Sequence, residues 1–382
     1  MDRDDPWSVT DRDLHDTLRS LREDSETAAV ASIVNVEGSA YRRPGAKLLA
    51  PAGDDTLGAI TAGCLEGPVA DLAQDARDTG TVVTETFDLM DDDQWGLGLG
   101  CNGIIDVLVE PLDDSFDPLL SALGDREPAT VLTVVDSHDP DVPVGARTVV
   151  TSAGARTTED RVAIPADAVA DLEDVSANAS EDGTSTVLTV ERTAGDLRVF
   201  VDGVTPAPEL VLFGAQNDVH AVARVGADAG FRVTVASPRG ARAAADQFPD
   251  AHRVVATHPA DLADVVESPE RTYAVLMSHN LVDDRIALET LLAETEVPYV
   301  GLMGPRERFR ELREDANTDG RTFTQSDLDR VSTPVGLDLG AGGPRGIAFS
   351  IVSEVLAVSN CSDGGRLSEQ SGPIHTRSDP TA

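Results

Sequence analysis

Two cysteines stand in glycine-bearing turns in the first third of the chain, where a thiol could contact a cofactor. Cys64 opens a predicted helix, and Cys101 lies between Gly100 and Gly103 in residues 96–103. A helix N-terminus favours thiolate and attracts anions, glycine permits close backbone approach to a ligand, and thiolates suit molybdenum or sulfur chemistry. The competing interpretation makes both cysteines small core residues. It is equally supported for Cys64, whereas the glycines around Cys101 favour function.

A third turn, residues 37–47, concentrates positive charge between two predicted strands. It holds Arg42, Arg43 and Lys47, and Lys47 is the only lysine among the 30 basic residues of the chain. A lysine kept where every other basic residue is arginine indicates a role for a compact ammonium group. This turn and the two cysteine turns therefore form one candidate site.

A second candidate site follows the first predicted strand of the second half. A dinucleotide fingerprint would need glycine at 214, 216 and 219, but only Gly214 is present, and Gln216 stands where the pyrophosphate would rest. Arg239 follows the second strand in place of the usual ribose-binding acid. NAD(P) is therefore the less favoured cofactor. His279 follows the fourth strand, at the edge where open α/β sheets bind ligands; a loop histidine bonded only to neighbouring backbone is an equally supported interpretation.

Composition narrows the class of protein. The chain has 382 residues with 68 acidic and 30 basic side chains, a formal net charge of −38. Acid spread over the whole chain indicates adaptation to high salt, and an acidic nucleic-acid mimic is the rival interpretation. Direct nucleic-acid binding is disfavoured because no basic stripe is present. No apolar run is long enough for a membrane span and no signal peptide is evident, so we expect a cytoplasmic protein.

Cysteine spacing argues against two kinds of site. Cys64, Cys101 and Cys361 lie far apart and form no CxxC pair, so we expect neither structural zinc nor a disulfide framework. Cys361 falls in a polar tail and is interpreted as incidental.

The elements that position the first site are predicted to be β-rich. We expect helices over residues 11–24 and 65–79, and strands at 28–36, 46–50, 81–87 and 104–110. Residues 176–185, rich in Ala, Ser and Asp, predict a solvated loop.

Residues 130–204 carry a weak internal echo of the first β region. The strand before Gly145-Ala146-Arg147 parallels the strand before Gly45-Ala46-Lys47, and each triplet leads into another strand. The echo indicates that residues 130–204 extend the same β domain.

From Pro206 onward short apolar runs alternate with helical segments, including one at 259–267, which predicts a parallel sheet covered on both faces. The predicted fold class is therefore α/β: an N-terminal α+β domain of mixed β-structure, residues 1–205, then a Rossmann-like doubly wound sheet, residues 206–358. An irregular polar tail, residues 359–382, follows.

Taken together and in order, these motifs resemble the XdhC/CoxI family of xanthine dehydrogenase accessory factors. The match covers nearly the whole chain. Its motifs lie at 38–39, 43–47, 63–66, 100–103, 212–215, 278–280, 299–301, 334–340 and 372–375. Two departures are Asn102, where a further glycine is usual, and residues 216–218, where the family commonly has glycine.

The resemblance implies a molybdenum cofactor-binding protein that delivers the cofactor, in sulfurated form, to an apo-hydroxylase. The client would be of the xanthine, carbon monoxide or aldehyde dehydrogenase type, with a cysteine desulfurase as a further partner. By position, Cys64 and Cys101 would contact the cofactor and face its molybdenum, with Arg43 and Lys47 near the pterin phosphate. We expect a maturation chaperone rather than an enzyme, and a homodimer as the commonest closed assembly. The alternative function is an NAD(P)-dependent oxidoreductase.

Overall fold

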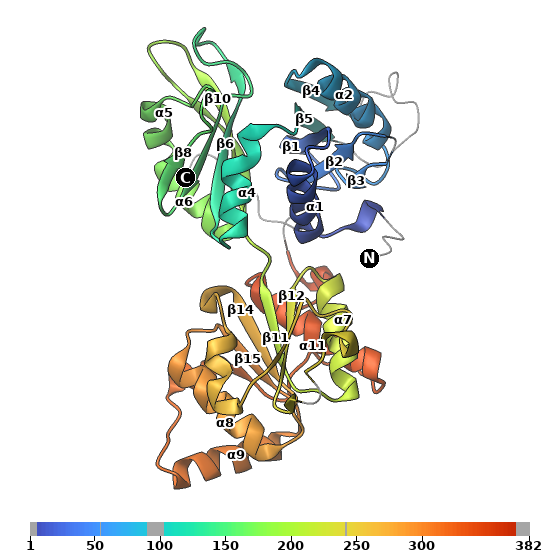
Figure 1. Ribbon diagram of the computed structural model, residues 1–382, viewed down its shortest axis with the longest axis vertical. Coiled ribbons are helices and arrows are strands. Elements are labelled where there is room, and N and C mark those ends of the chain that lie inside the picture. Colours follow the sequence, from blue (N-terminus) through green and yellow to red (C-terminus); the bar gives the residue numbers. More distant parts are fainter. Residues whose placement is uncertain (1–5, 54, 90–102, 241–242, 372–382) are drawn as a thin grey trace. The chain divides into compact units, whose positions relative to one another are not determined.

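The computed structural model describes residues 6–53, 55–89, 103–240 and 243–371. The chain divides after Pro206 into two compact units, each described here by itself (Figure 1). No helix in the described ranges is long and apolar enough to cross a membrane.

The N-terminal unit begins with a capped helix. Thr10 accepts a hydrogen bond from the Asp13 backbone N–H, and the Asp13 carboxylate accepts one from the Thr10 N–H in return, which satisfies two backbone donors at the start of α1 (Asp11–Glu23). Leu14, Leu18 and Leu21 then recur at helical spacing and are buried. The predicted first helix is confirmed.

Two five-stranded antiparallel sheets follow α1, with the same strand order (Figure 1). The first sheet has the order β3-β2-β1-β5-β4, with bounds β1 Ala28–Gly38, β2 Lys47–Pro51, β3 Leu57–Gly58, β4 Val83–Asp88 and β5 Gly103–Pro111. The second has the order β8-β7-β6-β10-β9, with bounds β6 Ala129–Ser137, β7 Arg147–Thr151, β8 Gly154–Arg156, β9 Ser185–Val190 and β10 Leu197–Val204. Helix α2 (Glu66–Thr79) precedes β4, and α5 (Ala166–Asp171) and α6 (Glu173–Asp182) precede β9. Helix α4 (Asp117–Gly124) precedes β6 as α1 precedes β1.

The two sheets match in detail as well as in order. The pairing of β1 with β5 skips Val34, and the pairing of β6 with β10 skips Val135, so each central pair bulges at the equivalent place. The Gly45 N–H donates to the Ile33 carbonyl at 2.8 Å, and the Gly145 N–H donates to the Val134 carbonyl at 2.8 Å. The N-terminal unit is therefore two copies of one α-β-β-β-α-β-β pattern, which we call its first and second halves.

Equivalent residues of the two halves meet where the halves pack. A small apolar cluster joins Val34 and Leu108 of the first half to Val135 and Phe200 of the second. The strand registers make Val34 equivalent to Val135, and Leu108 equivalent to Phe200. The packing of the halves therefore follows an approximate two-fold relation.

The C-terminal unit is a six-stranded parallel sheet in the order β13-β12-β11-β14-β15-β16. Its strands are β11 Glu209–Phe213, β12 Arg232–Ser237, β13 Arg253–Ala256, β14 Thr272–Leu276, β15 Tyr299–Leu302 and β16 Val331–Ser332. Its principal helices are α7 Asn217–Asp228, α8 Leu281–Glu294, α9 Arg306–Thr318 and α11 Pro344–Ser359. Helices α7 and α11 pack on one face and α8 and α9 on the other. The predicted α/β fold class is confirmed, and the strand order is the Rossmann one.

One local prediction is wrong: residues 176–185, expected to be a loop, largely form α6. The helical segment expected at 259–267 is present as the 3-10 helix η5 (Pro259–Val265). Helix α6 buries only Ser176 and Ala179, so its sequence lacks an apolar stripe. It packs closely because β10 offers Gly203 beneath it, where a Cβ atom would lie 1.9 Å from the Ala179 carbonyl oxygen.

Candidate functional site

A hydrogen-bonded turn fixes the chain at the entrance to α2. The Glu66 carboxylate accepts from the Thr61 backbone N–H at 2.9 Å and from the Thr61 hydroxyl at 2.6 Å. The Thr61 hydroxyl in turn accepts from the N–H groups of Cys64 and Leu65 at 3.0 and 3.1 Å. One threonine and one glutamate therefore hold the whole turn, and with it the half-buried Cys64, in a single conformation.

The same turn leaves backbone open to a ligand. Gly63 has φ +108°, and a Cβ atom at Gly63 or at Gly67 would meet nothing within 4 Å. Among the described residues, the backbone N–H groups of Glu66 and Gly67 find no acceptor, as is usual in a first helical turn. Two backbone donors and a thiol thus lie together at one helix end, a combination suited to a ligand with an anionic group and a soft metal.

The residues that follow β1 lie near the entrance to α2, because Ala40 packs against the same cluster as Cys64. Gly38 pairs with Gly103, and a Cβ atom at Gly103 would lie 2.5 Å from the Ser39 carbonyl oxygen, so this close approach requires glycine. Ala40 and Cys64 both pack against the cluster beneath α2. Gly103 is thus explained by strand packing, while Gly100 and Cys101 lie outside the described residues.

Arg43 and Lys47 have different environments. Arg43 is exposed and has no ion-pair partner in the described part of the chain. The Lys47 ammonium is half-buried and donates to the Asp202 carboxylate at 2.7 Å and to the Gly45 carbonyl at 3.0 Å. Lys47 therefore joins the two halves of the unit, and Arg43 is the cation of this turn that faces solvent.

A histidine that sequence reasoning missed lies near the Lys47–Asp202 pair. Burial in α1 and the Lys47 charge lower the pKa of His15 to about 4, although Asp11, Asp202 and Asp16 oppose the shift. His15 is therefore neutral at pH 7, which avoids a second buried cation beside Lys47.

The counterpart of this pair joins the halves from the other side. Arg147 donates to Glu110 at 2.5 Å, and both side chains are almost fully buried. Burial raises the pKa of Glu110, and the Arg147 charge opposes that shift. In the registers, Arg147 is equivalent to Lys47 and Glu110 is equivalent to Asp202. The unit therefore carries two reciprocal ion pairs, each linking one half to the other.

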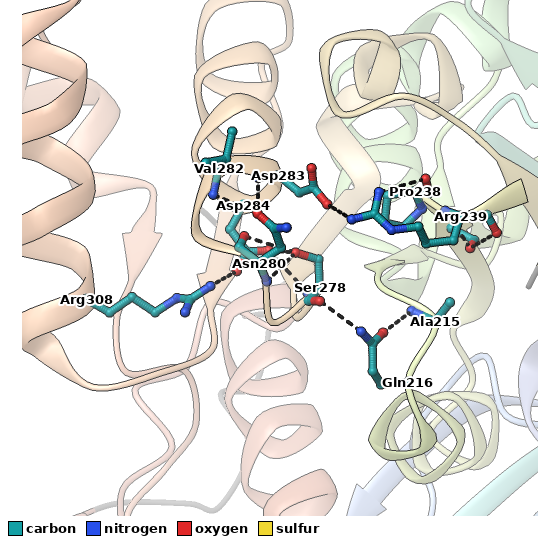
Figure 2. A network of polar contacts seen from close by, with 11 residues as sticks. Ala215, Gln216, Pro238, Arg239, Ser278, Asn280, Val282, Asp283, Asp284 and Arg308 are labelled. Carbon is teal, nitrogen blue, oxygen red and sulfur yellow. Dashed lines mark hydrogen bonds and ion pairs between the residues drawn. The ribbon is translucent and has the colours of Figure 1, made fainter.

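The second candidate site lies at the carboxyl ends of β11 and β14, where the strand order reverses. Gly214 follows β11, and a Cβ atom there would lie 2.7 Å from the Met277 carbonyl oxygen. The Gln216 side chain links the loops that follow β11 and β14. Its oxygen accepts from the Ala215 N–H at 3.0 Å, and its amide nitrogen donates to the Ser278 carbonyl at 3.1 Å (Figure 2). A side chain thus occupies the first turn, where a dinucleotide fold presents glycine to a pyrophosphate.

The loop after β14 is held by buried polar contacts. The Asp284 carboxylate accepts from the Ser278 hydroxyl at 2.5 Å and from Arg308 at 2.7 Å, and Asp284 is fully buried (Figure 2). Arg239 is exposed and donates to Asp283 at 2.9 Å. These contacts tie the ends of β12, β14 and β15 together and leave Arg239 at the rim.

His279 has a left-handed backbone conformation, with φ +59°, which residues other than glycine rarely adopt. Its Nε2 lies 2.6 Å from the Asp218 carboxylate, and half of the imidazole is exposed. The loop geometry therefore places His279 against the start of α7, so it bonds to a side chain of another element rather than only to neighbouring backbone.

Sequence reasoning placed Cys64 in a turn at the start of α2 but did not single out the two residues that fix this turn. Thr61 and Glu66 carry no metal or acid-base signature; the available signal was a hydroxyl and a carboxylate flanking a predicted helix start. Glu110 and Asp202 lie inside strands, far along the sequence from Arg147 and Lys47, and no local sequence pattern identifies them as their partners. In the described part of the chain, no three His, Cys, Asp or Glu side chains gather as a metal site would require.

Comparisons with known proteins agree with this organisation. The XdhC Rossmann domain matches residues 210–355, and the XdhC and CoxI family matches residues 21–88. A probable subunit of xanthine dehydrogenase from Bacillus subtilis strain 168 is 28% identical over 362 residues, covering 90% of this chain and 96% of that protein. Uncharacterized protein YqeB of Escherichia coli K12 is 28% identical over 186 residues, which span 47% of this chain and 32% of that protein.

A solved structure shares the fold along the chain. The crystal structure of a xanthine dehydrogenase from Bacillus halodurans has a TM-score of 0.72 and 24% sequence identity, and the match covers 93% of this chain and 97% of that chain. Both family domains occur in the expected order, one in each structural unit. The chain belongs to the XdhC and CoxI family.

Proposed function

We propose that the chain binds the molybdenum cofactor at the entrance to α2 and delivers it to a xanthine dehydrogenase-type hydroxylase. Family membership supports the accessory role, and the name of the B. subtilis relative, a probable xanthine dehydrogenase subunit, supports a link to that enzyme. The observation that carries the binding site is the turn 61–67, which holds Cys64, two backbone N–H groups with no acceptor among the described residues, and two glycines with open space beside them.

The donor set fits the cofactor's chemistry. A thiol is a soft ligand for molybdenum. The N–H groups of Glu66 and Gly67, with the positive end of the 14-residue helix α2, suit a phosphate. Arg43 is exposed and follows Ala40, which packs against the same cluster as Cys64, whereas Lys47 is held by Asp202. We therefore assign the phosphate to the helix end and Arg43.

The chain's own residues hold and release the ligand. Thr61 and Glu66 hold the backbone of the turn that carries Cys64, so little backbone entropy is lost on binding. The Glu66 carboxylate places a negative charge beside the phosphate site, which limits affinity and favours handover to a client. When bound, the cofactor supplies the molybdenum centre on which the client's hydroxylation depends. Sulfuration by a cysteine desulfurase and assembly as a homodimer complete the proposal.

Cofactor loading of matched cysteine variants tests the site. Protein isolated from cells that make the cofactor is assayed for molybdenum by mass spectrometry and for pterin by fluorescence. We expect Cys64→Ser to lower both contents at least tenfold, because the hydroxyl replaces the soft ligand. Cys361→Ser is the control, since Cys361 is exposed in the tail. Equal loading of wild-type and Cys64→Ser protein would refute the assignment.

A further inference from the structure

A pocket of about 370 Å³ opens beside the Arg147–Glu110 pair in the N-terminal unit, away from the turn 61–67. Prolines and valines form one part of its wall, and charged and hydroxyl-bearing side chains, among them Asp113, Arg156 and Arg161, form another. Val144 and Val162, which also line it, are more than one-third exposed. The pocket is of the size that binds small molecules, and its mixed apolar and charged wall includes the buried Arg147–Glu110 pair.

The charged pair leaves hydrogen-bonding capacity unused. Arg147 donates from Nη2 to Glu110, from Nη1 to Ser115 at 3.1 Å and from Nε to Thr133 at 3.3 Å. A guanidinium has five N–H groups, so two remain. Only Oε2 of Glu110 accepts a hydrogen bond, and Oε1 has no partner among the described residues. Oε1 of Glu110 is not sealed in the core, so this acceptor is open to the space of the pocket that Glu110 lines.

The equivalent pair in the unit shows what would satisfy it. Asp202 accepts from Lys47 through one oxygen and from the Ser185 hydroxyl, at 2.7 Å, through the other. The residue equivalent to Ser185 is Val82, which precedes β4 and lines the pocket. A Cβ atom at Gly45 would contact Ser185, and one at Gly145 would contact Val82, which supports this equivalence. Because valine has no hydroxyl, Glu110 lacks the donor that Asp202 receives.

A ligand that completes this pair must offer an N–H donor next to a carbonyl acceptor, on a compact body that fits beside the prolines and valines of the wall. We infer that the pocket binds a heterocycle with a cyclic amide edge, its N–H on Glu110 and its carbonyl oxygen on Arg147. Pterins and oxidised purines such as xanthine share this chemistry. The site is distinct from the Cys64 turn and does not rest on the proposed function.

Calorimetric titration of the full chain with pterin, xanthine and acetate tests the inference. We expect pterin or xanthine to bind and acetate not to compete. Tighter pterin binding would identify a pterin-derived ligand, and tighter xanthine binding a purine. Val82→Ser supplies the missing hydroxyl and should weaken binding about tenfold, whereas Ser185→Val, the matched change at the other pair, should leave it unchanged.

A second variant guards against indirect effects. Val144→Trp should block the pocket mouth and lower affinity at least tenfold, and Val282→Trp is its control because Val282 is exposed on α8 of the other unit. The inference is overturned if neither heterocycle binds, if acetate displaces them equally well, or if both Val82→Ser and Val144→Trp bind like wild type. Cofactor loading through Cys64 is measured separately, so the two proposals fail independently.

Discussion

The two halves of the N-terminal unit share one backbone plan but use it differently. Each half sends a cation from its second strand to a carboxylate in the last strand of the other half. In the Lys47–Asp202 pair, both carboxylate oxygens accept a hydrogen bond, one from Lys47 and one from Ser185, and His15 lies close by. In the Arg147–Glu110 pair, one carboxylate oxygen has no partner among the described residues, and the pair lines a pocket. The unit thus carries one closed copy and one open copy of the same ion pair.

The largest difference in stability between the two ion pairs should appear when the carboxylate of each pair is removed. We expect Glu110→Ala to lower the free energy of unfolding by about 3–5 kcal/mol, because it leaves Arg147 buried without a counter-charge. Asp202→Ala should cost less, about 2 kcal/mol, since the Lys47 side chain is more exposed, 16% against 5% for Arg147. Urea unfolding followed by tryptophan fluorescence reports on this unit, because Trp7 and Trp95 both precede Pro206.

A double variant controls for the origin of that cost. In Glu110→Ala with Arg147→Met, no charge is left buried, and much of the lost stability should return. If the double variant is as unstable as Glu110→Ala, the cost comes from packing and not from an unpaired guanidinium.

The stability of the protein around the closed copy, the Lys47–Asp202 pair, should fall in acid because of His15. The unfolded chain binds a proton near pH 6.5, but the folded chain does so only near its lowered pKa of about 4. Between these values the unfolded state holds more protons, so stability falls as pH falls from 6.5 to 4. The loss attributable to His15 is about 2–3 kcal/mol.

Comparing wild type with His15→Gln isolates this loss from that of the many carboxylates. Unfolding free energies measured at pH 7 and pH 4.5 should differ less in His15→Gln than in wild type. Equal pH dependence in both proteins would show that His15 is not held neutral. No matching histidine effect is expected at the Arg147–Glu110 pair, where no histidine lines the pocket.

How much of this was visible in the sequence depends on how far apart the interacting residues lie. The helical spacing in residues 11–24, the strand patterns before Pro206 and the alternation of strands and helices after it are local patterns, and they predicted the first helix and the fold class. The Lys47–Asp202 contact spans 155 residues, and nothing near Lys47 identifies its partner. Helix α6 was not predicted because its close packing depends on Gly203, which lies in strand β10 and not in the helix itself. Long-range partners, rather than local propensity, decide these features.

The smallest expected difference concerns the glycines before the two cations. Gly45 and Gly145 have φ +93° and +88°, so alanine is strained in both, at about 1 kcal/mol. At Gly145 the new Cβ would also press on Val82, 2.7 Å away. At Gly45 it would displace the Ser185 hydroxyl, 2.4 Å away, and break its hydrogen bond to Asp202. Gly45→Ala should therefore cost about 1 kcal/mol more than Gly145→Ala.

Gly154→Ala measures the cost of backbone strain without a steric contact, because Gly154 has φ +111° and open space around it. Subtracting its unfolding free-energy change from those of the other two variants leaves the contact terms. Adding Ser185→Val to the Gly45→Ala protein should abolish the excess, because no hydroxyl remains to be displaced from Asp202. The Lys47–Asp202 pair would then have an unpartnered carboxylate oxygen, as the Arg147–Glu110 pair has among the described residues. If the excess persists without the Ser185 hydroxyl, that hydrogen bond is not what distinguishes the closed copy from the open one.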